Sequence, residues 1–241
     1  MLPSAVALLA LFSAADGLVL RTRAPRMQIK NPFGGDFKNP FARKEDGATT
    51  IAVTLLFRCE DRGSRSSILG QVDELAAMAD TSTSDGISRL CGDTALALLR
   101  QKNAWLQSCT TSEHRARDDD ALRVFDMLAI REAAKFDGLE DGDTIDAALA
   151  AAGVSGGESA PPTNAVVCAI ACLMGDRTRD GMKPSSSGDA VEMKAVLEEM
   201  AAAANGEEEV FAFELFWVPG GTKEVVDMDQ VMLDWPELMP C

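Results

Sequence analysis

One segment of this chain has no polar face. Residues 165–174 read AVVCAIACLM, so the segment is apolar on both sides when it is extended. Ten residues are too few to cross a bilayer as a helix, which takes about 20. A strand with two apolar faces must be covered on both sides. We therefore predict a central β-strand here, and the rest of the chain must supply the structure that covers it.

Strand-like and helix-like patterns alternate on either side of this segment. In residues 210–218 the large side chains Phe211, Phe213, Leu215 and Trp217 recur at every second position, which predicts that they share one face of a strand. The overall order of patterns indicates an α+β fold, a small mixed or antiparallel sheet with helices packed on one face. The expected strands are 49–57, 103–112, 165–174 and 210–218, and the expected helices are 66–80, 86–100, 118–136, 144–152 and 190–204.

The first 46 residues differ from the rest and indicate a targeting leader. Residues 1–15 resemble a secretory signal, with an apolar run and then the small residues Ser13, Ala14 and Ala15, although no basic residue precedes the run. Residues 16–46 resemble a transit peptide, because residues 17–35 hold four basic side chains and no acid. A leader of two such parts is typical of plastid proteins in algae with secondary plastids; the alternative is a disordered basic tail. We expect residues 47–241 to form a single α+β domain.

Charge and the scarcity of histidine exclude several functions. The chain has 38 acidic and 23 basic side chains, a net charge of −15, and from residue 47 onward the net charge is −18. Such a field repels phosphate backbones, so we expect no nucleic-acid partner. The chain has a single histidine, His114, which we place in a polar loop over residues 110–120. One histidine excludes a two-histidine metal site within one chain.

The six cysteines do not form the pattern of a disulfide scaffold. Cys168 and Cys172 are four residues apart on the expected central strand, about 13 Å at roughly 3.3 Å per residue, so they cannot bond to each other. Cys91 lies on an expected helix beside core positions, where we expect it to be a small buried side chain. The other three cysteines are Cys59, Cys109 and Cys241, and we expect them to be exposed. Their thiols are expected to be reduced, and redox sensing by them is a hypothesis.

Motifs of known chemistry are missing from the sequence. It contains neither a Gly-x-x-x-x-Gly-Lys-Ser/Thr loop nor a Gly-x-Gly-x-x-Gly loop for phosphates. The acidic run at 118–120 lacks the alternating ligand spacing of a calcium loop and suits the start of a helix. We therefore expect no catalytic residue, no cofactor and no metal.

Three blocks of sequence resemble one family. The first block is DTSTSDGISRL at 80–90, continuing through TALALLR at 94–100 to Trp105. The third is FELFWVP at 213–219 with DWPEL at 234–238. These blocks resemble a cyanobacterial and plastid domain-of-unknown-function family that includes the plant fluctuating-light acclimation protein. The second block, which lies on the expected helix 118–136, consists of Phe125, Leu128, Arg131, Lys135 and Phe136.

The resemblance implies a regulatory role without catalysis or a cofactor. Members of the family resemble thylakoid- or envelope-associated proteins that modulate photoprotective energy dissipation when light fluctuates. The resemblance therefore implies that this chain is a non-enzymatic plastid protein that acts through a thylakoid or envelope membrane protein. Many members carry a Gly-rich membrane-spanning stretch before the domain, whereas this chain has Gly34 and Gly35 beside an Asn-Pro-Phe linker. We therefore expect peripheral membrane association or a stromal form.

Four residues are candidates for interaction. Arg89 and Arg100 are eleven positions apart on one expected helix, hence on a similar face, and are candidates for binding an acidic partner or a lipid phosphate. Trp105 and Trp235 are candidates as well, although tryptophan more often anchors a core. The alternative function is a small-molecule-binding or enzymatic domain with a cleft around Trp105, Arg100 and Cys109. The acidic tail 227–237 either latches the sheet edge or docks a partner.

Overall fold

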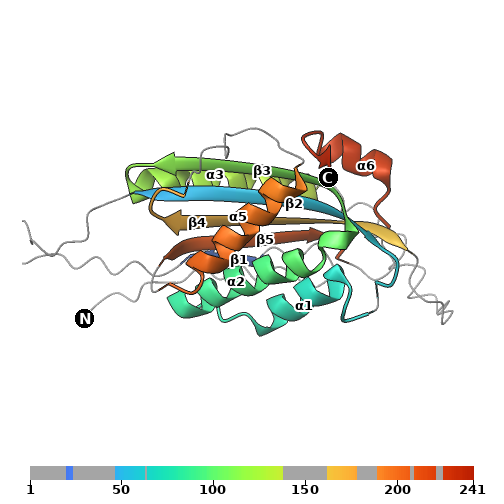
Figure 1. Ribbon diagram of the computed structural model, residues 1–241, viewed down its shortest axis with the longest axis horizontal. Helices are drawn as coiled ribbons and strands as arrows, with labels where there is room; N and C mark the ends of the chain where they lie inside the picture. Colours follow the sequence, from blue (N-terminus) through green and yellow to red (C-terminus); the bar gives the residue numbers. More distant parts are fainter. Residues whose placement is uncertain are drawn as a thin grey trace, which may run out of the picture.

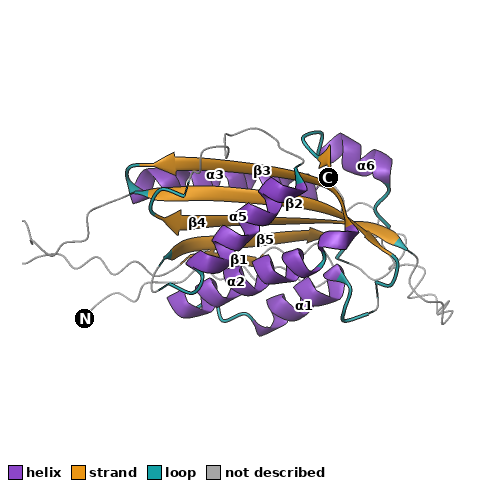
Figure 2. Ribbon diagram, viewed as in Figure 1, coloured by secondary structure: helices purple, strands orange, loops and turns teal. Residues whose placement is uncertain are grey.

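An antiparallel sheet runs through the domain in the computed structural model (Figures 1 and 2). The structure describes residues 20–23, 47–62, 64–137, 162–177, 189–206, 209–220 and 225–241. In this part of the chain the strand order is β1-β5-β4-β2-β3-β6, and every neighbouring pair is antiparallel. The predicted α+β class is confirmed. The strands are β1 (Leu20–Arg23), β2 (Ala48–Cys59), β3 (Trp105–Arg115), β4 (Thr163–Met174), β5 (Val210–Val218) and β6 (Met239–Pro240).

The two longest strands lie together in the middle of the sheet. β2 and β4 pair without interruption from Ala48 opposite Met174 to Cys59 opposite Thr163. Nearly every residue of both strands is buried. The prediction of a central strand at 165–174, covered on both sides, is confirmed.

Helices cover both faces of this sheet (Figure 1). α1 (Ile68–Met78), α2 (Ser84–Arg100) and α5 (Ala190–Ala203) lie on one face, and α3 (Asp118–Asp137) lies on the other. A short helix, α6 (Met228–Asp234), packs on the α3 side near one end of the sheet. The expectation that helices pack on one face is therefore wrong, because two central strands with apolar residues on both sides need a covering layer on each.

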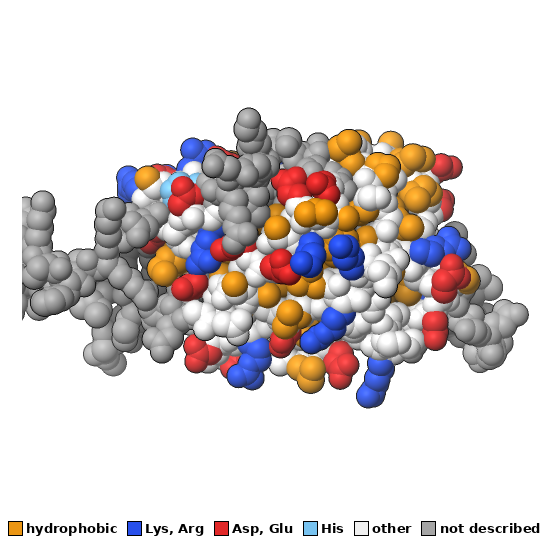
Figure 3. Space-filling view, in the orientation of Figure 1, with side chains coloured by type: hydrophobic (Ala, Val, Ile, Leu, Met, Phe, Trp, Pro, Cys, Tyr) orange, Lys and Arg blue, Asp and Glu red, His pale blue; other side chains and the backbone are white. Residues whose placement is uncertain are grey.

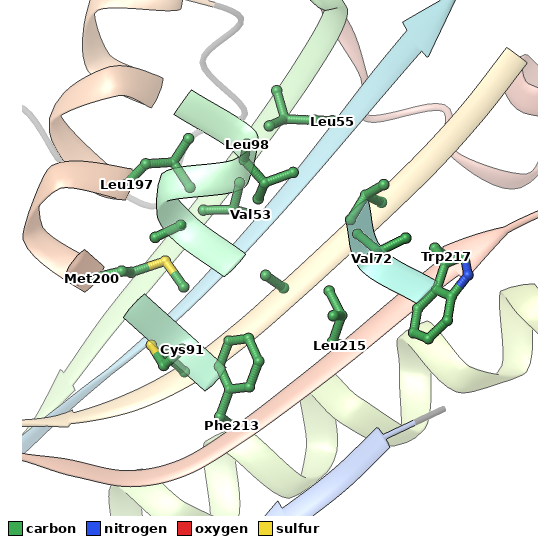
Figure 4. Close-up of a cluster of buried hydrophobic side chains, with 14 of the residues drawn as sticks. Val53, Leu55, Val72, Cys91, Leu98, Leu197, Met200, Phe213, Leu215 and Trp217 are labelled. Carbon is green, nitrogen blue, oxygen red and sulfur yellow. The ribbon is translucent and has the colours of Figure 1, made fainter. Parts of the chain in front are cut away.

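The two layers enclose two separate hydrophobic cores. Figure 4 shows the core beneath α1, α2 and α5, where Trp217 and Phe213 from β5 meet side chains of the three helices. On that side the helices contribute Val72, Leu98 and Leu197, which are fully buried. The core on the α3 side contains Leu56, Cys109, Leu122, Phe125, Cys168, Ile170, Cys172, Phe216 and Trp235.

A register shift moves one predicted core residue to the opposite face. Cys172 pairs with Ala212 and Leu173 pairs with Val210, so Phe211 is an extra residue in β5. Phe211 packs against the α3-side core, whereas Phe213, Leu215 and Trp217 face the other core. The prediction that all four share a face is wrong for Phe211, because a β-bulge interrupts the alternation of side chains.

β3 is longer than the sequence pattern indicates. It continues to Arg115, and His114 lies opposite Thr49 of β2. His114 is therefore on a strand and half-buried, and its placement in a polar loop is corrected. The expected helix at 144–152 and the leader lie outside the described residues, apart from residues 20–23, which pair with β5 as β1.

Candidate functional site

The turn between α1 and α2 is a rigid structure built by the first sequence block. Asp80 Oδ1 accepts hydrogen bonds from the backbone N–H of Ser82 at 3.0 Å and from its hydroxyl at 2.6 Å. These bonds, together with one from Thr83, hold the pKa of Asp80 below its usual value. Thr83 caps α2 by accepting from Gly86 N–H at 3.0 Å. A Cβ on Gly86 would lie 1.9 Å from the Asp80 carbonyl oxygen, so this block needs glycine there.

Arg89 and Arg100 lie on the solvent-facing side of α2, as their spacing predicts. Both side chains are exposed, and the same stripe of the helix also carries Asp85 and Asp93. Arg89 borders a hollow of about 390 Å³ between α1 and α2. Whether these arginines bind a partner stays a prediction.

The two tryptophans are structural anchors on opposite sides of the sheet. Trp105 is 7% exposed, and its indole N–H donates to the Leu98 carbonyl oxygen at 3.1 Å. Trp235 is 1% exposed and packs in the α3-side core. The four candidate residues therefore do not form one site.

The cleft expected around Trp105, Arg100 and Cys109 is not formed. Trp105 lies opposite Phe57, but Gln107 lies opposite Leu56, so Leu106 is an extra residue in β3. This bulge turns Trp105 toward the core under α2 and Cys109 toward the core under α3. A site that uses both side chains from one pocket is excluded by this geometry.

A pocket of about 440 Å³ lies instead between α3 and the C-terminal segment, residues 225–241. Its floor is the α3 side of the sheet, where Thr54, Cys109 and Thr111 contribute hydroxyl and thiol groups. The volume lies within the usual range for small-molecule sites. One wall is formed by Arg131, Glu132 and Lys135 of α3, and the other by Leu233, Asp234, Pro236 and Glu237.

A network of charges joins the two walls of this pocket. Glu132 is 2% exposed, and Arg131 donates from Nε and Nη2 to its Oε1 at 3.1 and 3.0 Å. Lys135 Nζ lies 3.0 Å from Glu132 Oε2 and also donates to Glu237 Oε1. Burial of the ammonium disfavours its charge, but hydrogen bonds and the charges of Glu237 and Glu132 outweigh this effect, so the pKa of Lys135 is raised. Lys135 thereby ties the C-terminal segment to α3.

The thiols near this pocket are held in their neutral form. Burial raises the pKa of Cys109 to about 11 and raises the pKa of Cys168 further. Cys59 is also buried, and burial raises its pKa. The expectation that Cys59 and Cys109 are exposed is therefore wrong, because both lie on strands that the helices cover. Cys241 is exposed, as predicted.

The position of Glu132 in the sequence is a signal for this charge network. Glu132 lies eleven, seven and three positions after Ala121, Phe125 and Ala129, all of which are buried on α3. A carboxylate on the apolar stripe of a helix is costly unless it is paired, so its position predicts a buried cation partner. Glu237 could not be found this way, because its contact with Lys135 spans 102 residues.

The described residues contain a histidine close to a hydroxyl and a carboxylate. His114 Nδ1 lies 3.4 Å from Thr49 Oγ1 and 4.0 Å from Asp176 Oδ1, so both groups approach the same ring nitrogen. The Thr49 hydroxyl donates to the Gly175 carbonyl oxygen, which leaves no hydroxyl–imidazole–carboxylate relay. Within the described ranges no group of three or more potential ligands could hold a metal ion. No helix in those ranges is long and apolar enough to span a membrane.

The parts that surround the pocket come from two of the three sequence blocks. Arg131 and Lys135 belong to the second block, and Asp234 and Glu237 belong to the third. Residues 47–241 match the family model described as "Protein of unknown function (DUF1517)". The chain belongs to this family. The resemblance found in the sequence blocks is confirmed.

The chain is also similar to a curated cyanobacterial protein. The chain is 27% identical over 201 residues to "Protein FLAP1 homolog A" of Synechocystis sp.. The match covers 80% of this chain but 56% of the relative, so this DUF1517 chain spans little more than half the length of that protein. No solved structure matches the chain.

Proposed function

We propose that this chain is a non-enzymatic plastid protein of acclimation to fluctuating light, which tunes photoprotective energy dissipation by binding a thylakoid or envelope membrane protein. The observation that carries the proposal is the similarity to the FLAP1 homolog over 201 residues, which covers 80% of this chain. The transit-like composition of residues 16–46 supports a plastid location.

The distribution of surface side chains also supports a binding role. α2 presents Arg89 and Arg100 to solvent along one stripe, and α6 presents Met232 and Leu233. Large exposed apolar side chains grouped with charges are typical of protein interaction surfaces. The exposed side chains of these two helices suit recognition of a partner.

A depletion experiment tests the physiological part of the proposal. Cells that lack the protein are compared with parental and complemented cells under steady light and under alternating high and low light, by chlorophyll fluorescence. We expect the induction and relaxation of energy dissipation to differ under alternating light and to agree under steady light. Equal fluorescence traces in both regimes would refute the role in acclimation.

A fractionation experiment tests the partner. The tagged full chain is purified from the membrane and soluble fractions of plastids, and the proteins recovered from each are identified. Enrichment of a particular membrane protein, absent from a mock-tagged control, is the expected result. Recovery from the soluble fraction alone with no membrane protein contradicts this part of the proposal.

A second candidate function is small-molecule binding in the pocket between α3 and the C-terminal segment. The pocket's volume and its mixture of hydroxyl, thiol and charged groups favour it. Native mass spectrometry of the purified full chain tests it. We expect a small molecule to be retained by the native chain and lost from Thr111→Val, which removes one hydroxyl from the floor of the pocket. That result would favour this function over a pure protein-docking role.

A further inference from the structure

The C-terminal segment, residues 225–241, combines acidic and exposed apolar side chains and contains no basic residue. Leu233 is 74% exposed and Met232 is 54% exposed, although both lie on a helix of the folded domain. Figure 3 shows hydrophobic side chains gathered over the end of the molecule that carries α6. We call this region the α6 surface, and it consists of Val225, Asp229, Met232, Leu233, Asp234, Pro236, Glu237 and Met239.

The α6 surface is held in place from beneath. Asp227 caps α6 by accepting from Gln230 N–H at 2.8 Å, and Trp235 is buried directly after the helix. Glu237 is tied to Lys135 of α3, and β6 pairs with β3. The exposed apolar side chains are therefore displayed by a fixed structure, which lowers the entropy lost when a partner binds.

The adjoining pocket is bordered by the same residues. Leu233, Asp234, Pro236 and Glu237 line both the α6 surface and the pocket of about 440 Å³. The pocket contains three carboxylates but two cations, and Glu132 already pairs with both cations. The local charge is therefore negative, and a side chain that enters the pocket from this surface meets an excess of carboxylate oxygen.

We propose that the α6 surface binds a basic amphipathic segment of a partner protein, with its apolar side chains on Met232 and Leu233 and its Lys or Arg side chains toward Asp229 and Asp234. The charge of the segment decides between occupants. An anionic lipid surface or an acidic peptide would be repelled by a segment with four acids and no base. A second copy of this chain that presented its own C-terminal segment would bring the same four acids and no base to the contact.

This inference deepens the proposed function, since it names the chemistry of the membrane-protein segment. Loops that flank membrane-spanning helices are rich in Lys and Arg on one side of the membrane. A segment of that kind next to the bilayer would satisfy both the apolar and the acidic part of the α6 surface.

Site-specific photo-cross-linking in intact plastids tests the inference. The full chain carries benzoylphenylalanine in place of Leu233, and the matched control carries it in place of Val191, which is 71% exposed on α5 on the other face of the sheet. The cross-linked peptides are identified by mass spectrometry. We expect the Leu233 position to capture a segment with more Lys and Arg than Asp and Glu, and the Val191 position not to capture it.

Affinity measurements with that captured segment, made as a synthetic peptide, provide the quantitative test. Asp229→Asn with Asp234→Asn is expected to weaken binding about tenfold at low salt, with a smaller effect at high salt. The control pair Glu60→Gln with Glu74→Gln removes two exposed acids elsewhere and is expected to change binding less than about twofold. Leu233→Ser is expected to weaken binding about tenfold, and Val191→Ser is not.

Several results would overturn the inference. They are capture of an acidic or uncharged segment, capture of lipid or of a second copy of this chain, no capture at Leu233, or equal effects of the test and control variants. The proposed function can survive such a result. If depletion alters photoprotection while the α6-surface variants restore it fully, the acclimation role holds and the binding surface is wrong.

Discussion

Lys135 is the residue whose removal tests the charge network most directly. Its Nζ lies 3.0 Å from the buried Glu132 carboxylate and also pairs with Glu237. Replacement by Met keeps the length of the side chain and removes the ammonium. Breaking a buried ion pair from one side costs about 3–5 kcal/mol. Because Arg131 still donates to Glu132 Oε1, we expect the unfolding free energy to fall by somewhat less than this range, about 2–3 kcal/mol.

Urea denaturation of the full chain measures this loss, and a thermal scan should show a melting temperature lower by about 5–10 °C. Adding Glu132→Gln to Lys135→Met removes the buried carboxylate that has lost its ammonium partner. This change should recover at least about 1 kcal/mol of unfolding free energy, as a double-mutant cycle with each single variant reveals. Lys194→Met is the matched control, since Lys194 pairs with Glu198 at 2.9 Å in solvent and should cost less than about 0.5 kcal/mol. Equal losses for Lys135→Met and Lys194→Met would refute the reasoning.

Three further predictions follow from other contacts. Gly86→Ala should destabilise the protein by about 1–3 kcal/mol despite the better helix propensity of alanine, because the new Cβ meets the Asp80 carbonyl oxygen at 1.9 Å; a gain in urea midpoint would contradict this. The pKa of Asp80 is lower in the folded chain than its value of 3.8 in the unfolded chain. The ionised carboxylate therefore stabilises the fold above pH 3.8, and this stabilisation is lost as the pH falls through the lower folded pKa. The difference in unfolding free energy between wild type and Asp80→Asn should therefore shrink in acid, and a difference independent of pH would exclude the effect. Iodoacetamide should label Cys241 of the native chain much faster than Cys109, whose pKa burial raises to about 11, and equal rates by peptide mass spectrometry would show that the pocket thiol is accessible.

Local periodicity predicted most of the individual elements. The apolar run at 165–174 became β4, and the expected helix at 86–100 became α2. Each of these depends on residues a few positions apart. The spacing of Arg89 and Arg100 likewise predicted their shared exposed stripe, because a helix fixes such relations from sequence alone.

Features that depend on contacts between distant residues were not predictable in the same way. The bulges at Leu106 and Phe211 each insert one residue that no alternation pattern reveals. The first separates Trp105 from the face of Cys109, and the second places Phe211 itself on the α3 side. The pocket needs α3, the floor of the sheet and the C-terminal segment at once. The position of Glu132, a charged residue on the apolar stripe of a helix, is the feature of the sequence that predicts part of this pocket.

The position of β2 has a consequence for how the chain folds during synthesis. β2 is the first long strand of the domain, yet its partner β4 is more than 100 positions away, and β5 follows later still. β2 therefore emerges from the ribosome long before the strand that completes its pairing. Contacts between such distant segments slow folding, and an unpaired apolar strand is prone to aggregate in the meantime. Until β4 is made, β2 can be paired by β3 and covered by helices α1, α2 and α3, which all precede β4 in the chain.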